Sequence, residues 1–368
     1  MPQRIAAAAL PASHVEAHAR YLGTRFFGSL DGLRAVSILA VVWHHTGAAA
    51  FAGPLGQQGK HGVSLFFVIS GYLIATLILR AKQAGNFRLG RFWGRRVLRI
   101  FPVYFAVLAL YAVLTWVMER HSPDGEEFFA TLPAFATFTA NWVLPLESPR
   151  VIFYFAWSLA AEEQFYLVWP FLALWLAGMR PALVAVLVLL GSQYLGLDYA
   201  ATLGRELPAR LATCLPPGIL LGVILAYLLH APAGFAAAFR LAGYRWSAPA
   251  AVLASLVMLA IGREFGPAEG LAVALPLTWL VAACVVREDH GLARVLRLAP
   301  LVWIGTVSYG MYLLHMLAVN LVRRVGAVAG IDNPLIDFVA GTMVALAAAS
   351  ISFLYYERPF LRLKERLF

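Results

Sequence analysis

Long apolar runs separated by short polar segments dominate the chain. A membrane-spanning helix needs about 20 apolar residues, because the hydrocarbon core of a bilayer is ~30 Å thick. The runs predict ten spanning helices, approximately at 32–52, 63–81, 98–118, 155–177, 182–197, 211–230, 247–262, 269–286, 301–323 and 335–356. A further apolar stretch, 128–146, contains prolines and polar residues and is predicted to be interfacial or re-entrant. The pattern therefore predicts an all-α fold, a polytopic transmembrane bundle of about ten spans.

Composition supports a membrane setting. The chain is 61% hydrophobic and 13% charged, and its mean hydropathy is +0.75, far above that of soluble domains. The two cysteines, Cys214 and Cys284, fall within predicted helices and indicate neither a disulfide framework nor a metal site. The motifs of phosphate loops, zinc proteases and serine elbows do not occur. We expect any chemistry to lie among the helices, without a bound cofactor.

Basic residues favour one side of the predicted bundle. With both termini placed in the cytoplasm, roughly three quarters of the 29 Lys and Arg residues fall on the cytoplasmic side, which fixes the orientation. The net charge of +10 follows from this topology and requires no nucleic-acid partner. The expected division is a cytoplasmic segment at 1–28, a membrane domain at 29–358 and a cytoplasmic tail at 359–368.

Ionisable residues share one stripe of the first predicted span. Arg34 and His45 are eleven positions apart, close to three helical turns, so their side chains align about 16 Å apart along the axis. Asp31 lies on the same face as Arg34, whereas His44 is turned about 100° away. Ionisable groups inside a membrane usually line a cavity or a reaction path. The alternative for a lone histidine is a packed side chain that bonds to a neighbouring helix.

Arginines gather before the third predicted span, in the segment FRLGRFWGRRVLRIFPVY, at Arg88, Arg91, Arg95, Arg96 and Arg99. Positive-inside anchoring accounts for some of them. Guanidinium groups also bind phosphate bidentately, and Arg96 and Arg99 are one helical turn apart. The pair is a candidate cradle for a phosphorylated ligand.

Two further clusters are candidates for function. In WSLAAEEQFYLVWP, which begins at Trp157, Glu162 and Glu163 enter an apolar helix and Glu162 shares a face with Tyr166; an interfacial aromatic belt is the alternative. In WIGTVSYGMYLLHM, a polar stripe comprises Ser308, Tyr309, Tyr312 and His315. Interhelical hydrogen bonding is the commoner role for such a stripe.

The chain resembles acyltransferase family 3, the bacterial polytopic membrane O-acyltransferases. The resemblance rests on the ordered segments FFGSLDGLRAVSILAVVWHH, HGVSLFFVISGYLIATLI, FWGRRVLRIFPVY, WSLAAEEQFYLVWP, WIGTVSYGMYLLH and FLYYERPFL. It implies transfer of an acyl group, most often acetyl, from acyl-CoA to a hydroxyl of a sugar, polysaccharide, peptidoglycan precursor or macrolide. It also implies a bacterial inner-membrane location.

The resemblance also suggests roles for individual residues. It maps the family's essential histidine to His45, its preceding basic residue to Arg34, its RxxR motif to Arg96 and Arg99, and its motif glutamate to Glu162. Members that modify cell-wall polymers often append an extracytoplasmic hydrolase-like domain. This sequence stops at Phe368, so we expect activity within the membrane domain or with a separate partner.

The expected chemistry follows from these residues. Neutral His45 is expected to accept the proton of the acceptor hydroxyl, Glu162 to orient the imidazole or stabilise its charged form, and the arginines to hold the donor's phosphates. Direct transfer and an acyl-His45 intermediate that carries the group across the membrane are both open. A proton-coupled transporter or flippase that uses His45, Glu162 and Arg34 as a relay is the alternative from another class.

Overall fold

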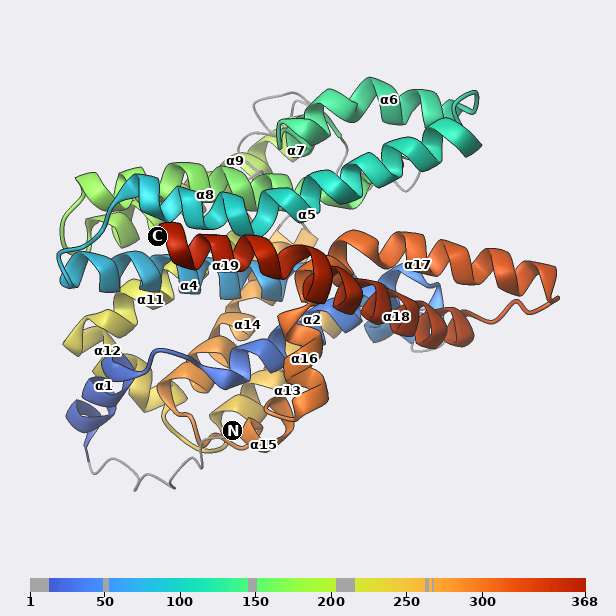
Figure 1. Ribbon diagram of the computed structural model, residues 1–368. Helices are drawn as coiled ribbons and strands as arrows, with labels where there is room; N and C mark the ends of the chain where they lie inside the picture. The colour runs from blue at the N-terminus through green and yellow to red at the C-terminus, as the bar shows by residue number, and fades with distance from the viewer. Residues whose placement is uncertain (1–12, 49–52, 145–150, 203–215, 262–264, 267) are drawn as a thin grey trace.

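The fold is helical throughout the part of the chain that the computed structural model describes, residues 13–48, 53–144, 151–202, 216–261, 265–266 and 268–368, and no strand occurs there (Figure 1). The predicted fold class is thereby confirmed as all-α. The α-helices are α1 His14–Gly23, α2 Gly28–His45, α3 Gly53–Gly56, α4 Gly62–Gln83, α5 Leu89–Met118, α6 Pro123–Ala136, α7 Ala140–Val143, α8 Trp157–Trp175, α9 Arg180–Thr202, α11 Pro217–His230, α12 Pro232–Ala242, α13 Ser247–Ile261, α14 Glu269–Val286, α15 Ala293–Leu296, α16 Ala299–Thr306, α17 Ser308–Val328, α18 Pro334–Ile351 and α19 Arg358–Leu367. Short 3-10 turns cover Gln57–His61 (η2) and Tyr154–Ala156 (η3), and a π-helical turn covers Ser352–Glu357 (η5).

Within these residues, 5 helical segments are long and apolar enough to cross a membrane: Gln57–Gln83, Leu89–Met118, Glu269–Val286, Ser308–Val328 and Pro334–Leu367. Two bent pairs, α1 with α2 at 73° and α11 with α12 at 111°, raise the number to 7 if each counts as one span. The protein is therefore a multi-pass membrane protein by length and composition. The count of ten spans and the cytoplasmic position of both termini stay predictions.

Several predicted spans have different bounds in the structure. The helix expected at 32–52 runs from Gly28 to His45, and the helix expected at 98–118 begins nine residues earlier, at Leu89. The span expected at 301–323 is broken at Val307 into α16 and α17. The span expected at 335–356 leaves the α-helical conformation at Ser352, and the predicted tail 359–368 belongs to α19. The segment 128–146 contains the end of α6 and all of α7, and both helices are shorter than a span. Its last two residues lie outside the described part, as do 262 and 211–215, which include Cys214.

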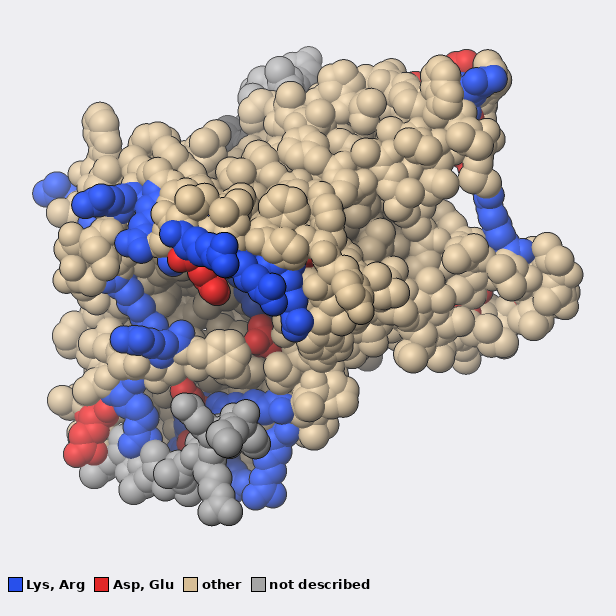
Figure 2. Space-filling model, viewed as in Figure 1, with Lys and Arg blue, Asp and Glu red and all other residues tan. Residues whose placement is uncertain are grey.

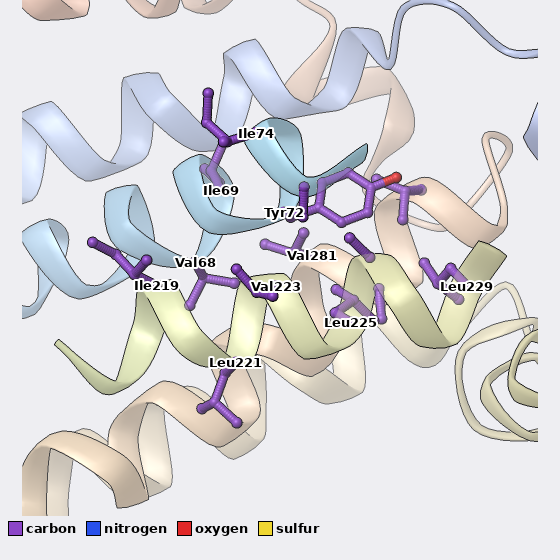
Figure 3. Close-up of a cluster of buried hydrophobic side chains, with 14 of the residues drawn as sticks. Val68, Ile69, Tyr72, Ile74, Ile219, Leu221, Val223, Leu225, Leu229 and Val281 are labelled. Carbon is purple, nitrogen blue, oxygen red and sulfur yellow. The ribbon is translucent and has the colours of Figure 1, made fainter. Parts of the chain in front are cut away.

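The largest core cluster joins α4, α11 and α14 (Figure 3). Its side chains include Val68, Ile69, Tyr72, Ile219 and Val281, each fully buried. Glycines let α4 and α11 approach closely, because a β-carbon at Gly71 would meet the Ile219 carbonyl and one at Gly222 the Val68 carbonyl. Small residues at such contacts are typical of membrane helix packing.

A second cluster joins α2, α5, α8, α17 and α18. Helices α5 and α6 form one hairpin and α17 and α18 another, and both extend to the right in Figure 1. The two hairpins are linked at their ends by an ion pair of 3.4 Å between Arg324 and Glu119. The second cluster therefore surrounds the region where the candidate residues of α2, α5, α8 and α17 meet.

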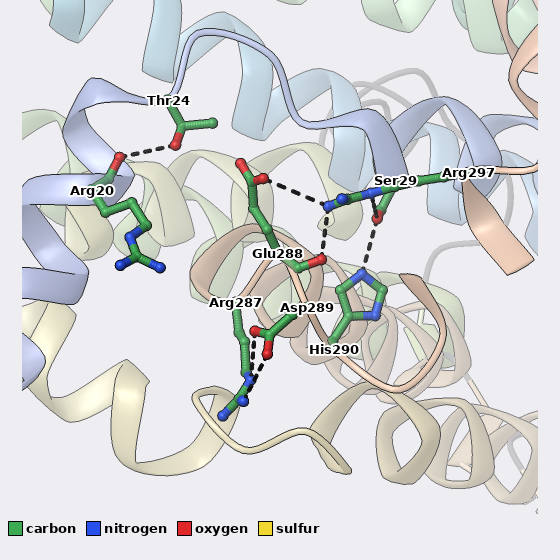
Figure 4. A network of polar contacts seen from close by, with 8 residues as sticks. All are labelled: Arg20, Thr24, Ser29, Arg287, Glu288, Asp289, His290 and Arg297. Carbon is green, nitrogen blue, oxygen red and sulfur yellow. Dashed lines mark hydrogen bonds and ion pairs between the residues drawn. The ribbon is translucent and has the colours of Figure 1, made fainter. Parts of the chain in front are cut away.

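A polar network holds the segment after α14 against the start of α2 (Figure 4). The Ser29 hydroxyl lies 2.9 Å from His290 Nε2 and accepts from Arg297 Nε at 3.3 Å. Arg297 also donates to the Glu288 carbonyl at 2.8 Å, while Arg287 forms a bidentate ion pair with Asp289. This network holds the first turn of α2 in place. Asp31 lies in that turn, and Arg34 follows one turn later.

Candidate active site

One cavity gathers most of the candidate residues. Its volume is about 110 Å³, and it lies among α2, α4, α5, α8, α16 and α17. The polar and charged residues that line it are Arg34, Ser70, Arg96, Arg99, Ser158, Glu162, Glu163, Tyr166, Thr306, Ser308, Tyr309 and Tyr312. Segments that are far apart in the sequence thus supply three guanidinium and two carboxylate groups to one space.

Arg34 enters the cavity from α2, one turn above Asp31. Its guanidinium donates to Asp31 Oδ1 at 3.0 Å, and its side chain is 23% exposed. Gly305 of α16 lies directly against the Asp31 backbone, where a β-carbon would overlap the Asp31 carbonyl. The close packing of α16 on α2 therefore orients the Asp31–Arg34 pair toward the cavity.

The arginines of α5 lie on the helix itself, not on a loop before it. Arg96 and Arg99 are i and i+3 on the lining face, as the sequence predicts. The Arg96 guanidinium stands over the Tyr166 ring at 5.1 Å and over Phe92 at 5.9 Å. Arg99 is exposed, and the charges of Arg34 and Arg96 act on it unfavourably. The cavity thus presents three guanidinium groups, which are suited to an anion, beside the carboxylates of Glu162 and Glu163.

Basic side chains also gather around the hollow beside α19 (Figure 2). α19 packs against α5, where Arg91 and Arg95 donate to the backbone oxygen of Phe368. Arg91 and Arg95 are thereby bound at the α5–α19 contact and do not line the cavity.

Both carboxylates of α8 line the cavity. Glu162 accepts a hydrogen bond from the Tyr166 hydroxyl, one turn along the helix, as the shared face predicts. Glu163 lies next to it and interacts electrostatically with Arg96. Trp157 lies outside the lining and packs edge-on against Phe67, with ring centroids 6.1 Å apart. The two carboxylates therefore share one cavity with the three arginines.

The polar stripe of α17 bonds to neighbouring helices, as predicted for interhelical contacts. The Tyr312 and Ser158 hydroxyls are 2.6 Å apart, and Tyr309 donates to the Ile100 carbonyl at 3.3 Å. Ser308 donates to the Gly305 carbonyl at 2.8 Å, across the break between α16 and α17. Irregular backbone within a membrane is tolerated where it lines a cavity, and this break does so at Gly305, Thr306 and Ser308.

His45 lies at the end of α2 and outside the lining of the cavity. Its Nδ1 is 2.8 Å from the Val41 carbonyl and its Nε2 is 2.7 Å from the Tyr154 hydroxyl. The His315 ring centroid is 4.9 Å away, and the His315 ring is in turn 5.6 Å from that of Tyr312. A row of rings therefore connects the cavity, through Tyr312 and His315, to His45.

Glu162 is not brought into contact with His45. The two His45 nitrogens bond to Val41 and Tyr154, whereas Glu162 bonds to Tyr166. Sequence spacing alone could not place α8 relative to α2, because the register between two packed helices depends on long-range contacts.

Tyr154 is the principal functional candidate that the sequence did not indicate. It follows Phe153, a buried residue held in the left-handed conformation with φ 68°. A residue with a β-carbon adopts that conformation only when its surroundings enforce it, which occurs often at functional sites. Glu357 is another such candidate: it closes the π-helical turn η5, lies 3.2 Å from the Ser352 hydroxyl and interacts electrostatically with Arg99. The sequence carried a signal only for Glu357, in the motif FLYYERPFL.

The chain is similar in sequence to known bacterial proteins. "Peptidoglycan O-acetyltransferase OatA" of Listeria monocytogenes is 27% identical over an alignment of 327 positions that covers 82% of this chain and 50% of that protein. "Putative peptidoglycan O-acetyltransferase YrhL" of Bacillus subtilis is 28% identical over an alignment of 367 positions that covers 91% of this chain and 55% of that protein. The chain thus spans about half the length of these curated relatives.

No solved structure matches the chain. The family model described as an acyltransferase domain matches residues 27–354, which include every residue that lines the cavity together with His45 and His315. The match covers most of the sequence, and the chain therefore belongs to acyltransferase family 3.

Proposed function

We propose that this protein is an integral membrane O-acyltransferase that moves an acyl group, most often acetyl, from acyl-CoA to a hydroxyl of a glycan. The observation that carries the proposal is the cavity in which Arg34, Arg96 and Arg99 face Glu162 and Glu163. Membership of the family supports acyl transfer, and the names of two relatives support acetyl as the group transferred. The inner membrane of a bacterium is the proposed location.

The donor site is proposed at the arginines. Acyl-CoA carries several phosphate charges, and guanidinium groups bind phosphate through paired N–H donors. Arg34 lines the same cavity as Arg96 and Arg99 and adds a third guanidinium group, close enough for its charge to act on Arg99. Glu162 fixes the Tyr166 hydroxyl, and the Tyr166 ring lies under Arg96, so Glu162 is proposed to position the Arg96 guanidinium through Tyr166.

The base is proposed to be His45 Nε2. A neutral imidazole that donates its Nδ1–H to the Val41 carbonyl carries an unprotonated Nε2, whose lone pair can accept a proton. The Tyr154 hydroxyl already occupies this nitrogen, which shows that an O–H group fits there. In the reaction, the acceptor hydroxyl gives its proton to Nε2 while its oxygen bonds to the thioester carbonyl carbon. The C–S bond then breaks, and the CoA thiolate leaves and takes up a proton.

The acceptor is proposed to be the glycan of peptidoglycan or a related polymer, following the names of the relatives. A test uses the full chain purified in detergent, so that both faces are accessible, with acetyl-CoA labelled in the acetyl group. Chitotriose, a soluble oligomer of N-acetylglucosamine, serves as the hydroxyl acceptor.

The expected result is release of CoA and label on the oligosaccharide. Label that stays on the protein in the absence of chitotriose supports an acyl-His45 intermediate. An inert protein that instead moves labelled glycan across vesicle membranes overturns the proposal in favour of a transporter.

A further inference from the structure

His315 carries a nitrogen that the row of rings leaves without a partner. The side chain is 0% exposed, and its Nδ1 lies 2.6 Å from the Tyr312 carbonyl in its own helix. Since a carbonyl only accepts, Nδ1 carries the proton and Nε2 presents a lone pair. Among the described residues no polar atom bonds to that Nε2. Buried polar atoms are nearly always hydrogen-bonded, so this nitrogen has an acceptor position open for a donor. Other buried nitrogens of the described residues share that property, and the position of His315 beside His45 distinguishes it from them.

The position of His315 identifies the kind of ligand. Its ring centroid is 4.9 Å from that of His45, whose own Nε2 receives a hydroxyl, that of Tyr154. The other rings packed against His315 are Phe155, at 5.0 Å, and Tyr312, at 5.6 Å. Two adjacent imidazoles with the same tautomer and an aromatic surround favour a neutral molecule with several hydroxyl groups over an anion.

We propose that His315 belongs to the binding site of the acyl acceptor, and that its Nε2 accepts a hydrogen bond from a second hydroxyl of the molecule whose first hydroxyl gives its proton to His45. The inference rests on the proposed function and deepens it: the acceptor presents at least two neighbouring hydroxyl groups, as a sugar ring does. The reacting hydroxyl takes the place of Tyr154 on His45 Nε2, and the neighbouring hydroxyl bonds to His315.

Two substitutions separate binding from a merely structural role. In His315→Asn the amide N–H mimics Nδ1 and keeps the bond to the Tyr312 carbonyl, but no acceptor remains at the Nε2 position. In His315→Gln the amide reaches the Nε2 position and its oxygen can accept from the ligand. A structural role predicts that Asn is tolerated and Gln is not; the proposed role predicts the opposite order.

The matched control is His230→Asn. His230 is similar: its Nδ1 lies 2.7 Å from the Ala226 carbonyl of its own helix and 3.3 Å from the Tyr21 hydroxyl, and its buried Nε2 has no partner among the described residues. It lies on α11 beside α1, where its ring meets Tyr21, and not beside His45.

The experiment measures the dissociation constant of chitotriose for the full chain in detergent, by saturation-transfer NMR without donor. His315→Asn is expected to weaken binding about tenfold, as the loss of one hydrogen bond implies. His315→Gln and His230→Asn should stay near the wild type. Equal constants for all variants, or no binding by the wild type, overturn the proposal.

A second measurement adds acetyl-CoA and a set of monodeoxy analogues of methyl N-acetylglucosaminide. One deoxy analogue should lose about tenfold in kcat/KM with the wild type but nothing further with His315→Asn, because both changes remove the same bond. Additive losses contradict the assignment. If the wild type binds chitotriose through His315 but transfers no acetyl group, the proposed function is refuted, whereas the binding role of His315 stands.

Discussion

At the scale of single residues, His45 and its neighbour His44 differ in what they face. His45 bonds to Val41 and Tyr154, whereas His44 packs against Gly59 of the turn η2. We expect His45→Ala to abolish acetyl transfer without loss of folded protein, and His44→Ala to keep substantial activity. Transfer assays with size-exclusion chromatography check both variants. Equal loss in the two variants, or full activity of His45→Ala, would contradict His45 as the base.

Arg96 and Arg99 are expected to bind the phosphates of the donor through paired N–H groups. Arg96→Lys or Arg99→Lys should weaken coenzyme A binding by about 10- to 100-fold, because a charge-assisted hydrogen bond is worth roughly 1.5–3 kcal/mol and lysine lacks the planar fork. Titration calorimetry measures the constants. Arg91→Lys is the control, since Arg91 bonds to Phe368 at the α5–α19 contact. Unchanged constants in the first two variants would place the donor elsewhere.

At the scale of elements, the contact between α2 and α16 determines how Arg34 enters the cavity. Gly305→Ala would drive a β-carbon into the Asp31 carbonyl, so the helices must separate. We expect a loss of about 1–3 kcal/mol, as for overpacking in other cores, and weaker coenzyme A binding. Thermal unfolding in detergent measures the loss. Gly90→Ala on α5 is the control, because a β-carbon at Gly90 meets nothing within 4 Å; similar losses in both variants would rule out the contact as the cause.

The segment between α14 and α15 should make stability depend on pH. Burial lowers the pKa of His290 from 6.5 to about 4, and Arg297 adds to the effect. The unfolded chain therefore binds more protons than the folded protein between these values. The stabilisation is present above about pH 6.5 and is lost as the pH falls toward 4, by an amount on the order of 3 kcal/mol. Melting curves of wild type and His290→Gln should converge at low pH; parallel curves would refute the role of His290.

The bounds of a helix were predictable from the sequence where the residues of the helix itself determine where it begins and ends. α14 has the predicted bounds, 269–286, because its apolar run is continuous. The Arg34–His45 stripe and the Glu162–Tyr166 and Arg96–Arg99 pairs follow from helical periodicity. The break at Val307 and the turn at Phe153 depend on contacts with Asp31 and with packed aromatic rings far away in the sequence. For the same reason Tyr154 could not be foreseen as the partner of His45.

At the scale of the whole molecule, the ends of the helices form two opposite faces. The α4–α5 and α8–α9 turns and the end of α19 lie together on the left in Figure 1, and the α5–α6 and α17–α18 turns lie on the right. We expect Asn86→Cys to react with an impermeant thiol reagent only from the cytoplasm, and Asp124→Cys only from outside, in a background where Cys214 and Cys284 are serine. Labelling of intact cells and inverted vesicles measures this. Reaction of both sites from one side would refute the predicted course of α5.

Under the proposed function, the distance along α2 between Arg34 and His45 bears on how material outside the membrane would be acylated. The two residues are about 16 Å apart, roughly half the ~30 Å hydrocarbon core. A donor bound at the arginines keeps its charged nucleotide in the compartment where it is made, and only its uncharged arm and acyl group extend toward His45. Moving the whole cofactor through lipid would require desolvation of every phosphate. A separate system that exports the activated donor is then unnecessary. The bond between the acyl group and the acceptor forms while the charged nucleotide of the donor stays on the side of the membrane where it was made.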